Sequence, residues 1–213
     1  MKYPSLKEEK KLWKEGYKSV ACFDEAGRGP LAGPVVAAAA MIKDPNCKIR
    51  ISCVNDSKKL SAKKRQEFYR VLTVHPGISW GMGKVSERII DKINILEATK
   101  LAMERALKSL NRKLKTANRK IDFLVLDGNF KIDLPIPQKS IVKADEKVFS
   151  CAVASIIAKV TRDRIMERCH KKYPQYGFDK HKGYFTKLHR LLLKRHGCCK
   201  IHRKTFRPLK KNN

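Results

Sequence analysis

Residues 20–40 read VACFDEAGRGPLAGPVVAAAA, and this stretch decides how the rest of the chain folds. Its apolar start predicts a buried strand over residues 19–24, which ends in two adjacent carboxylates, Asp24 and Glu25. Carboxylates are rarely buried without a partner or a metal ion. Because a regular strand points neighbouring side chains to opposite faces, both can serve one site only where the strand ends, bulges or turns.

A glycine-rich turn follows the two carboxylates. Gly27, Arg28, Gly29 and Pro30 lead into a second apolar run over residues 34–42, which predicts a second buried strand. Since glycine lacks a Cβ atom, this turn lets backbone N–H groups come close to a ligand such as a phosphate or a ribose. Taken alone, the same residues also describe an acidic strand end with an ordinary Gly/Pro turn.

The composition indicates a polyanionic partner. The chain has 213 residues, with 49 Lys and Arg against 20 Asp and Glu, and a formal net charge of +29. This balance favours nucleic acid over an anionic membrane. The sequence contains no apolar run of about 18 residues, and its first residues are charged rather than signal-like, so we expect a soluble, cytoplasmic protein. The seven cysteines, an odd number, indicate reduced thiols.

Two more carboxylates follow strand-like runs. Residues 122–127 (DFLVLD) end at Asp127, and residues 140–143 (SIVK) predict a short strand before Asp145. The ends of parallel strands gather at one edge of a sheet, where open α/β sheets bind ligands. Carboxylates gathered there would repel one another unless hard cations lay between them, and oxygen ligands favour Mg²⁺ or Mn²⁺. Two such ions about 3.5–4 Å apart can promote in-line attack on a phosphodiester.

The remaining pattern predicts one domain. We expect an N-terminal arm or short helix over residues 1–18, a domain over 19–208 with a helical basic part from about 170, and a disordered tail over 209–213. Further predicted elements are a strand over 78–85 and helices after Ser61, after Ser86 with a break near Asn94, over 147–169 and over 186–196. In the 147–169 helix, Arg162, Asp163 and Arg164 are expected to form structural ion pairs.

Several residues outside the strands are candidate contacts to nucleic acid or metal. Ser57 and Lys58 precede a helix and suit a phosphate, although a solvated turn is an equal alternative. The C-terminal part interleaves aromatic residues such as Tyr184 with basic ones, which favours a sugar-phosphate backbone. We expect the leucines of the 186–196 helix to face inward and the following residues to reach phosphates: Lys194, Arg195, Arg203 and Lys204. Adjacent Cys198 and Cys199 would chelate zinc poorly.

Seven motifs carry a family resemblance over residues 20–208. In order they are DEAGRGPLAGPV, NDSKKLS, INILEAT, LDGN, KADEKVFSCAVASIIAKVTRD, YPQYGFDKHKGY and HGCCKIHRKTF. Together they resemble bacterial ribonuclease HII, the type 2 ribonuclease H family. The resemblance implies an α/β, ribonuclease H-like fold with a mixed five-stranded sheet flanked by helices and a helical C-terminal part.

The resemblance also implies a function. It implies an endonuclease that hydrolyses the RNA strand of RNA–DNA hybrids and cuts at ribonucleotides embedded in duplex DNA. The expected mechanism uses two divalent ions, Mg²⁺ or Mn²⁺, and leaves a 3′-hydroxyl and a 5′-phosphate. We expect a monomer without a membrane partner.

The resemblance assigns roles residue by residue. The four residues that match the family's metal-binding carboxylates are Asp24, Glu25, Asp127 and Asp145. Gly27, Arg28 and Gly29 match the loop that contacts the ribose 2′-OH, and Tyr184 matches the tyrosine that stacks beside the junction ribonucleotide. Ser57 and Lys58 fall in a motif expected near phosphates. The related ribonuclease HIII type usually has Glu where this chain has Asp145.

Two other classes of function remain open on the residues alone. A non-catalytic, basic RNA-binding protein would account for the charge but not for carboxylates at successive strand ends. Another metal-dependent nuclease, such as a junction resolvase, would account for both.

Overall fold

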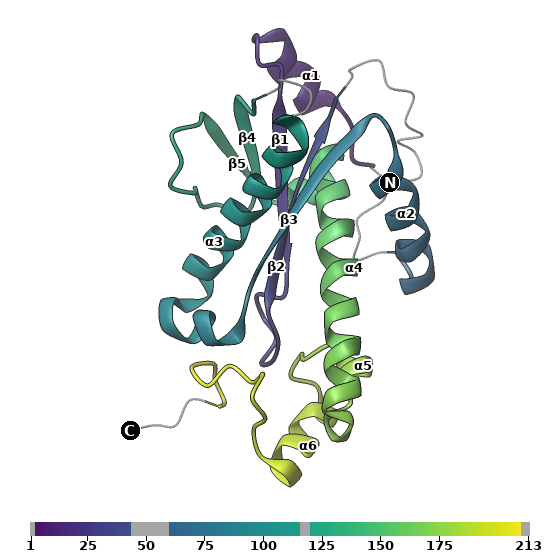
Figure 1. Ribbon diagram of the computed structural model, residues 1–213, viewed down its shortest axis with the longest axis vertical. Helices are drawn as coiled ribbons and strands as arrows, with labels where there is room; N and C mark the ends of the chain where they lie inside the picture. Colours follow the sequence, from purple (N-terminus) through teal and green to yellow (C-terminus); the bar gives the residue numbers. More distant parts are fainter. Residues whose placement is uncertain (1–2, 44–59, 116–119, 210–213) are drawn as a thin grey trace.

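A mixed five-stranded sheet forms the centre of the molecule (Figure 1). The computed structural model describes residues 3–43, 60–115 and 120–209. The sheet has the order β3-β2-β1-β4-β5, with antiparallel β1–β2 and β2–β3 pairs and parallel β1–β4 and β4–β5 pairs. The strands are β1 (Val20–Ala26), β2 (Val35–Ile42), β3 (Ile78–Val85), β4 (Phe123–Asp127) and β5 (Gln138–Ile141). The predicted fold class is thereby confirmed.

Strand β1 continues past the point where the sequence predicted its end. It remains regularly paired through both carboxylates, with Asp24 opposite Ala38 and Glu25 opposite Ala37. The expectation of a strand that stops at residue 24 is therefore wrong. The turn begins at Gly27, whose φ of +100° is a backbone conformation that residues with a Cβ rarely adopt. Regular alternation consequently places the Asp24 and Glu25 side chains on opposite faces of the sheet.

Two long helices cover the two faces of the sheet (Figure 1). Helix α3 (Glu87–Lys115) packs on the face that carries Ala37 and Ala39, whereas α4 (Phe149–Lys172) packs on the face that carries Ala38 and Ala40. The alanine run of β2 is buried throughout, because helices on both sides exclude water from it. Asp24 lies opposite Ala38 and thus faces α4.

The break predicted near Asn94 is confirmed as a kink inside α3. Asn94 has a non-helical backbone (φ 66°, ψ 171°), and its side-chain oxygen accepts hydrogen bonds from the N–H groups of Leu96 (2.8 Å) and Glu97 (3.1 Å). The side chain thus caps the second helical segment in the manner of an N-cap.

Shorter helices complete the fold. They are α1 (Lys7–Lys14), α2 (Ala62–Val74), α5 (Phe178–His181), α6 (Lys187–His196) and the 3₁₀ turns η2 (Ala144–Glu146) and η3 (Pro174–Tyr176). Ser61 caps α2 as predicted, its hydroxyl accepting from the Lys64 N–H at 3.3 Å. None of the helices in the described ranges is long and apolar enough to span a bilayer.

Helix α6 does not bury its leucines as expected. Leu188 and Leu191 are 38% and 62% exposed, and the buried position on this helix belongs to His189. His189 bonds to His202 at 3.0 Å and packs on Phe178, so histidine and aromatic contacts take the central place on α6. Leu192 and Leu193 are half-buried, and Leu193 packs on the same aromatic cluster.

Strand β3 and helix α3 approach each other through glycine. A Cβ atom at Gly83 would lie 2.1 Å from the backbone oxygen of Ala102, which is too close for any real contact. We therefore expect Gly83→Ala to lower the free energy of unfolding by about 1–3 kcal/mol through overpacking. Urea denaturation against the exposed control Lys84→Ala on the same strand measures this effect. Equal stability of the two variants would contradict the close packing.

Candidate active site

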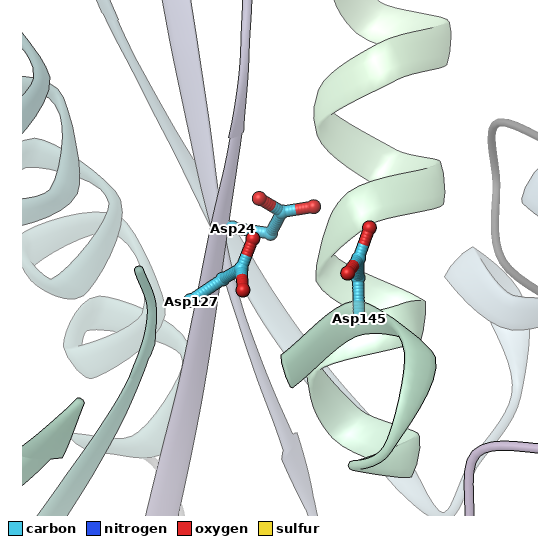
Figure 2. A group of neighbouring side chains, drawn as sticks. All are labelled: Asp24, Asp127 and Asp145. Atoms are coloured by element: carbon cyan, nitrogen blue, oxygen red, sulfur yellow. The ribbon is translucent and has the colours of Figure 1, made fainter. Parts of the chain in front are cut away.

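Three aspartates from the parallel strands β1 and β4 and from the segment after β5 come together at one edge of the sheet. The parallel register pairs Phe23 with Leu126, so the next residues, Asp24 and Asp127, lie side by side. Asp145 follows β5, in the short helix η2. Oxygen atoms of the three carboxylates all lie within 4.8 Å of one another, with Asp145 facing the other two (Figure 2). The structure thus brings together side chains that are up to 121 positions apart, from 24 to 145.

Backbone N–H groups fix the orientation of these carboxylates. The N–H of Ala144 donates to Asp127 Oδ1 at 2.6 Å and ties the turn before Asp145 to the end of β4. The N–H of Glu25 donates to Asp24 Oδ1 at 2.7 Å. Hydrogen bonds from amides to carboxylates are charge-assisted and directional. The two bonds consequently restrict the side chains of Asp24 and Asp127 before any ligand binds.

The electrostatics of Asp24 favour a cation. Its side chain is buried, and this burial raises the pKa of the Asp24 carboxyl well above its ordinary value. The nearby Glu25 and Asp127 carboxylates raise that pKa further, whereas a hydrogen bond with Ser155 opposes the shift. A hard divalent cation would relieve this repulsion, and an all-oxygen donor set is the kind that Mg²⁺ and Mn²⁺ prefer. The residues therefore fit such an ion.

A pocket of about 280 Å³ connects Asp24 and Asp127 with the glycine loop and Tyr184, whereas Asp145 is not part of its lining. Of the residues that the sequence predicted for the site, its lining contains Asp24, Glu25, Gly27, Arg28, Gly29, Asp127 and Tyr184. The Tyr184 ring lies close to the glycine loop, since a Cβ atom added at Gly29 would lie 3.9 Å from Tyr184 Cε1. Ser57 and Lys58 lie outside the described residues.

Glu25 lies beside the group of three rather than within it. Its side chain is only 11% exposed, and one of its oxygens lies 3.3 Å from Nη1 of Arg28. Regular strand alternation explains this position, because it turns Glu25 away from the face of Asp24. The carboxylate still borders the pocket, where β1 gives way to the glycine loop.

Two pocket residues come from α4 and were missed by the sequence analysis. Ser155 and Lys159 are one helical turn apart and line the pocket on the side of Asp24. Lys159 Nζ lies 2.7 Å from Asp163 Oδ1, and Arg65 approaches the other oxygen at 3.8 Å. Asp163 thus forms the ion pairs expected of it. The only sequence signal for these residues was the spacing 155, 159 and 163, which places them on one helix face.

Arg203 and Arg162 do not make the contacts that the sequence predicted for them. Arg203 is fully buried and therefore does not reach phosphates as expected, in contrast to the exposed Lys194, Arg195 and Lys204. Arg162 was predicted to form an ion pair, but it donates hydrogen bonds to backbone carbonyls instead.

Removing the charge of Asp24 should stabilise the metal-free protein. Because the pKa of Asp24 is raised, the folded protein loses stability as the pH rises above 3.8, the ordinary pKa of aspartate. At pH 7 in the presence of a chelator, the Asp24→Asn variant should therefore have a higher melting temperature than the unsubstituted protein. In a chain of this size, each kcal/mol of added stability raises the melting temperature by roughly 2–4 °C. The difference should shrink toward pH 4.

Thermal melts in EDTA at several pH values measure this difference, and the exposed Asp133→Asn serves as the matched control. A lower melting temperature of Asp24→Asn at neutral pH would refute the assigned repulsion.

Comparison with known proteins identifies the family. A family model described as Ribonuclease HII matches residues 21–209. The chain is 49% identical over 199 residues to the ribonuclease HII of Chlamydia muridarum (strain MoPn / Nigg), covering 93% of this chain and 87% of that protein. It is 45% identical over 204 residues to that of Alkaliphilus oremlandii (strain OhILAs), covering 95% and 97%.

A solved structure agrees with these relatives. The ribonuclease H2 from Pyrococcus horikoshii OT3 superposes with a TM-score of 0.69 at 29% identity, covering 90% of this chain and 95% of that one. The arrangement of carboxylates described above thus sits in a known nuclease fold. The chain belongs to the ribonuclease HII family and is a ribonuclease H, a hydrolase of nucleic-acid phosphodiesters.

Proposed function

We propose that this ribonuclease H hydrolyses the RNA strand of RNA–DNA hybrids and also cuts at single ribonucleotides embedded in duplex DNA. The observation that supports this proposal is the pocket that Asp24 and Asp127 share with the loop Gly27–Arg28–Gly29 and Tyr184. A loop able to meet a ribose lies directly beside groups able to act on the adjoining phosphodiester. The products are a 3′-hydroxyl and a 5′-phosphate.

The carboxylates would hold two divalent cations, Mg²⁺ or Mn²⁺. The residues that we assign to them are Asp24, Glu25, Asp127 and Asp145. Such ions, when bound, lower the pKa of a water molecule and offset the charge on the leaving oxygen. The chain contributes the fixed geometry, since the N–H groups of Glu25 and Ala144 hold Asp24 and Asp127 in place.

Other pocket residues are suited to holding the substrate. Lys159 brings a positive charge to the pocket, and Asp163 holds its ammonium group in place. The 2′-OH is the group that distinguishes RNA from DNA at a given position, and the Gly27–Gly29 backbone is our candidate for reading it. The Tyr184 ring, 44% exposed, is available to stack on the neighbouring sugar or base.

The surface beside the pocket suits a nucleic-acid backbone. Helix α6 exposes Lys187, Arg190 and Lys194 close in sequence to the exposed rings of Tyr184 and Phe185. Basic side chains position a duplex through its phosphates, and they carry no sequence information. We therefore assign α6 to holding the duplex rather than to selecting its sequence. Ser57 and Lys58 remain proposed phosphate contacts.

One experiment separates this proposal from its rivals. It measures Mg²⁺-dependent cleavage of duplex DNA that contains one ribonucleotide, with all-DNA and all-RNA duplexes of the same sequence as controls. We expect a cut at the ribonucleotide and none in either control. A non-catalytic RNA-binding protein would cut none of the three, and a junction resolvase would not depend on the ribonucleotide.

Asp127→Asn should abolish cleavage while sparing binding. The amide keeps an oxygen that can accept from the Ala144 N–H, so the fold is retained, but it removes a charge beside the reacting phosphate. We expect the cleavage rate to fall by at least about 10³-fold, as for groups that act together on reacting atoms. Fluorescence anisotropy should give an unchanged affinity for the hybrid. Near-normal turnover would disprove the metal-site assignment.

Tyr184→Ala should impair cutting at an embedded ribonucleotide more than it impairs binding to DNA. Loss of a stacked ring costs about 1–3 kcal/mol per base, which corresponds to roughly 5- to 150-fold in the rate. Tyr184→Phe keeps the ring and serves as the matched control, with near-normal cutting expected. Equal losses of cutting and of all-DNA affinity in Tyr184→Ala would count against stacking at the junction.

A further inference from the structure

Two arginines are buried beneath the glycine loop. Arg162, on α4, and Arg203, in the C-terminal segment, are among the largest fully buried side chains. Burial lowers the pKa of both guanidinium groups, and the neighbouring Arg162 lowers that of Arg203 further. In the part of the chain that the structure describes, no carboxylate forms an ion pair with either group. Burying a cation without such a partner lowers the stability of the folded protein, so other interactions must compensate for it.

The guanidinium of Arg203 binds the carbonyl groups of the loop. Its Nη2 donates to the carbonyl oxygen of Gly27 at 2.7 Å, and its Nη1 donates to that of Arg28 at 3.0 Å. Its Nε donates to the carbonyl oxygen of Gly33 at 2.9 Å, at the far end of the same loop. The planar fork of one side chain thus holds both ends of the turn.

These bonds set the direction of two N–H groups. In a planar trans peptide, the carbonyl of one residue and the N–H of the next point in opposite directions. The 27–28 and 28–29 peptide bonds are trans. Since the carbonyls of Gly27 and Arg28 point inward to Arg203, the N–H groups of Arg28 and Gly29 point away from it. Gly27, Arg28 and Gly29 all line the pocket, so these outward N–H groups are the loop donors available to a ligand there.

Arg162 joins this loop to the segment that carries Tyr184. It donates to the carbonyl oxygens of Pro34 (3.0 Å) and Ala32 (3.1 Å) within the loop, and to that of Lys182 (3.0 Å) just before Tyr184. Its side chain also fills the space beside Gly27, where an added Cβ atom would lie 2.1 Å from Nε. Arg162 therefore fixes the separation between the loop and Tyr184.

We infer that Arg203, assisted by Arg162, is a positioning residue for ribose recognition, because it turns the N–H groups of Arg28 and Gly29 toward the substrate. This inference rests on the proposed function, in which the loop reads the 2′-OH. Both arginines are fully buried and act through backbone carbonyls, those of the loop and, for Arg162, also that of Lys182. Lysine could keep the charge, but it cannot reproduce the fork that binds three carbonyls.

Binding discrimination tests the inference without relying on catalysis. In an Asp127→Asn background, affinities are measured for duplex DNA with one ribonucleotide and for all-DNA duplex of the same sequence. Adding Arg203→Lys should lower the ratio of the two affinities by about tenfold, the scale of a lost hydrogen bond. Arg168→Lys, exposed on α4, is the matched control and should leave the ratio unchanged.

Each pattern of results decides a different point. A merely structural role of Arg203 would lower the melting temperature and weaken both duplexes equally, and an unchanged ratio in Arg203→Lys would overturn the inference. If the Asp127→Asn parent itself showed no preference for the ribonucleotide, the proposed function would fail, and the inference with it.

A second measurement remains decisive if Arg203→Lys does not fold. Hydrogen exchange of the Arg28 and Gly29 amides is followed by NMR in the Asp127→Asn protein. We expect fast exchange in the free protein and protection by the duplex with one ribonucleotide, but not by all-DNA duplex. Slow exchange in the free protein would show that these N–H groups face inward, and would overturn the inference.

Discussion

Mutual repulsion among three neighbouring carboxylates is the interaction on which the rest of the site depends. Asp24, Asp127 and Asp145 bring their oxygens within 4.8 Å of one another, and two of them, Asp24 and Asp145, are buried, so water screens their charges poorly. Parallel pairing of β1 with β4 enforces this proximity, and amide donors prevent the side chains from turning away. The fold thus holds an arrangement that is unfavourable while the carboxylates are charged and that a bound cation would relieve at neutral pH, as is common where function opposes stability.

Positive charge lies near the three aspartates both on the protein surface and in the interior beneath the glycine loop. On the surface, the excess of basic residues suits the phosphates of a duplex. Beneath the glycine loop, Arg162 and Arg203 lie close to the site, but backbone carbonyls rather than carboxylates surround them. Because these guanidinium groups bind carbonyls, they do not neutralise the aspartates, whose negative charge stays available to bind metal ions. It also leaves the loop amides available to a ligand.

Much of this molecule could be predicted from its sequence, because buried strands ending in carboxylates are a strong pattern. The residues alone indicated the strands that carry the carboxylates and the break at Asn94, whereas the mixed five-stranded sheet came only with the family resemblance and its strand order was not predicted. Ser155 and Lys159 escaped notice, since nothing local distinguishes them from other helical residues. The local sequence does not distinguish Arg203 from the exposed basic residues near the C-terminus. Its burial depends on distant segments of the chain, which the local sequence does not specify.

The spacing of the aspartates along the chain has a thermodynamic consequence. Asp24 is in the first strand and Asp145 follows the last, so a continuous segment of the chain carries all three aspartates only if it spans all five strands. Cation affinity is therefore linked to cooperative folding of the whole domain rather than to a local loop. Depleting divalent ions should lower global stability, and any condition that loosens the sheet should release them.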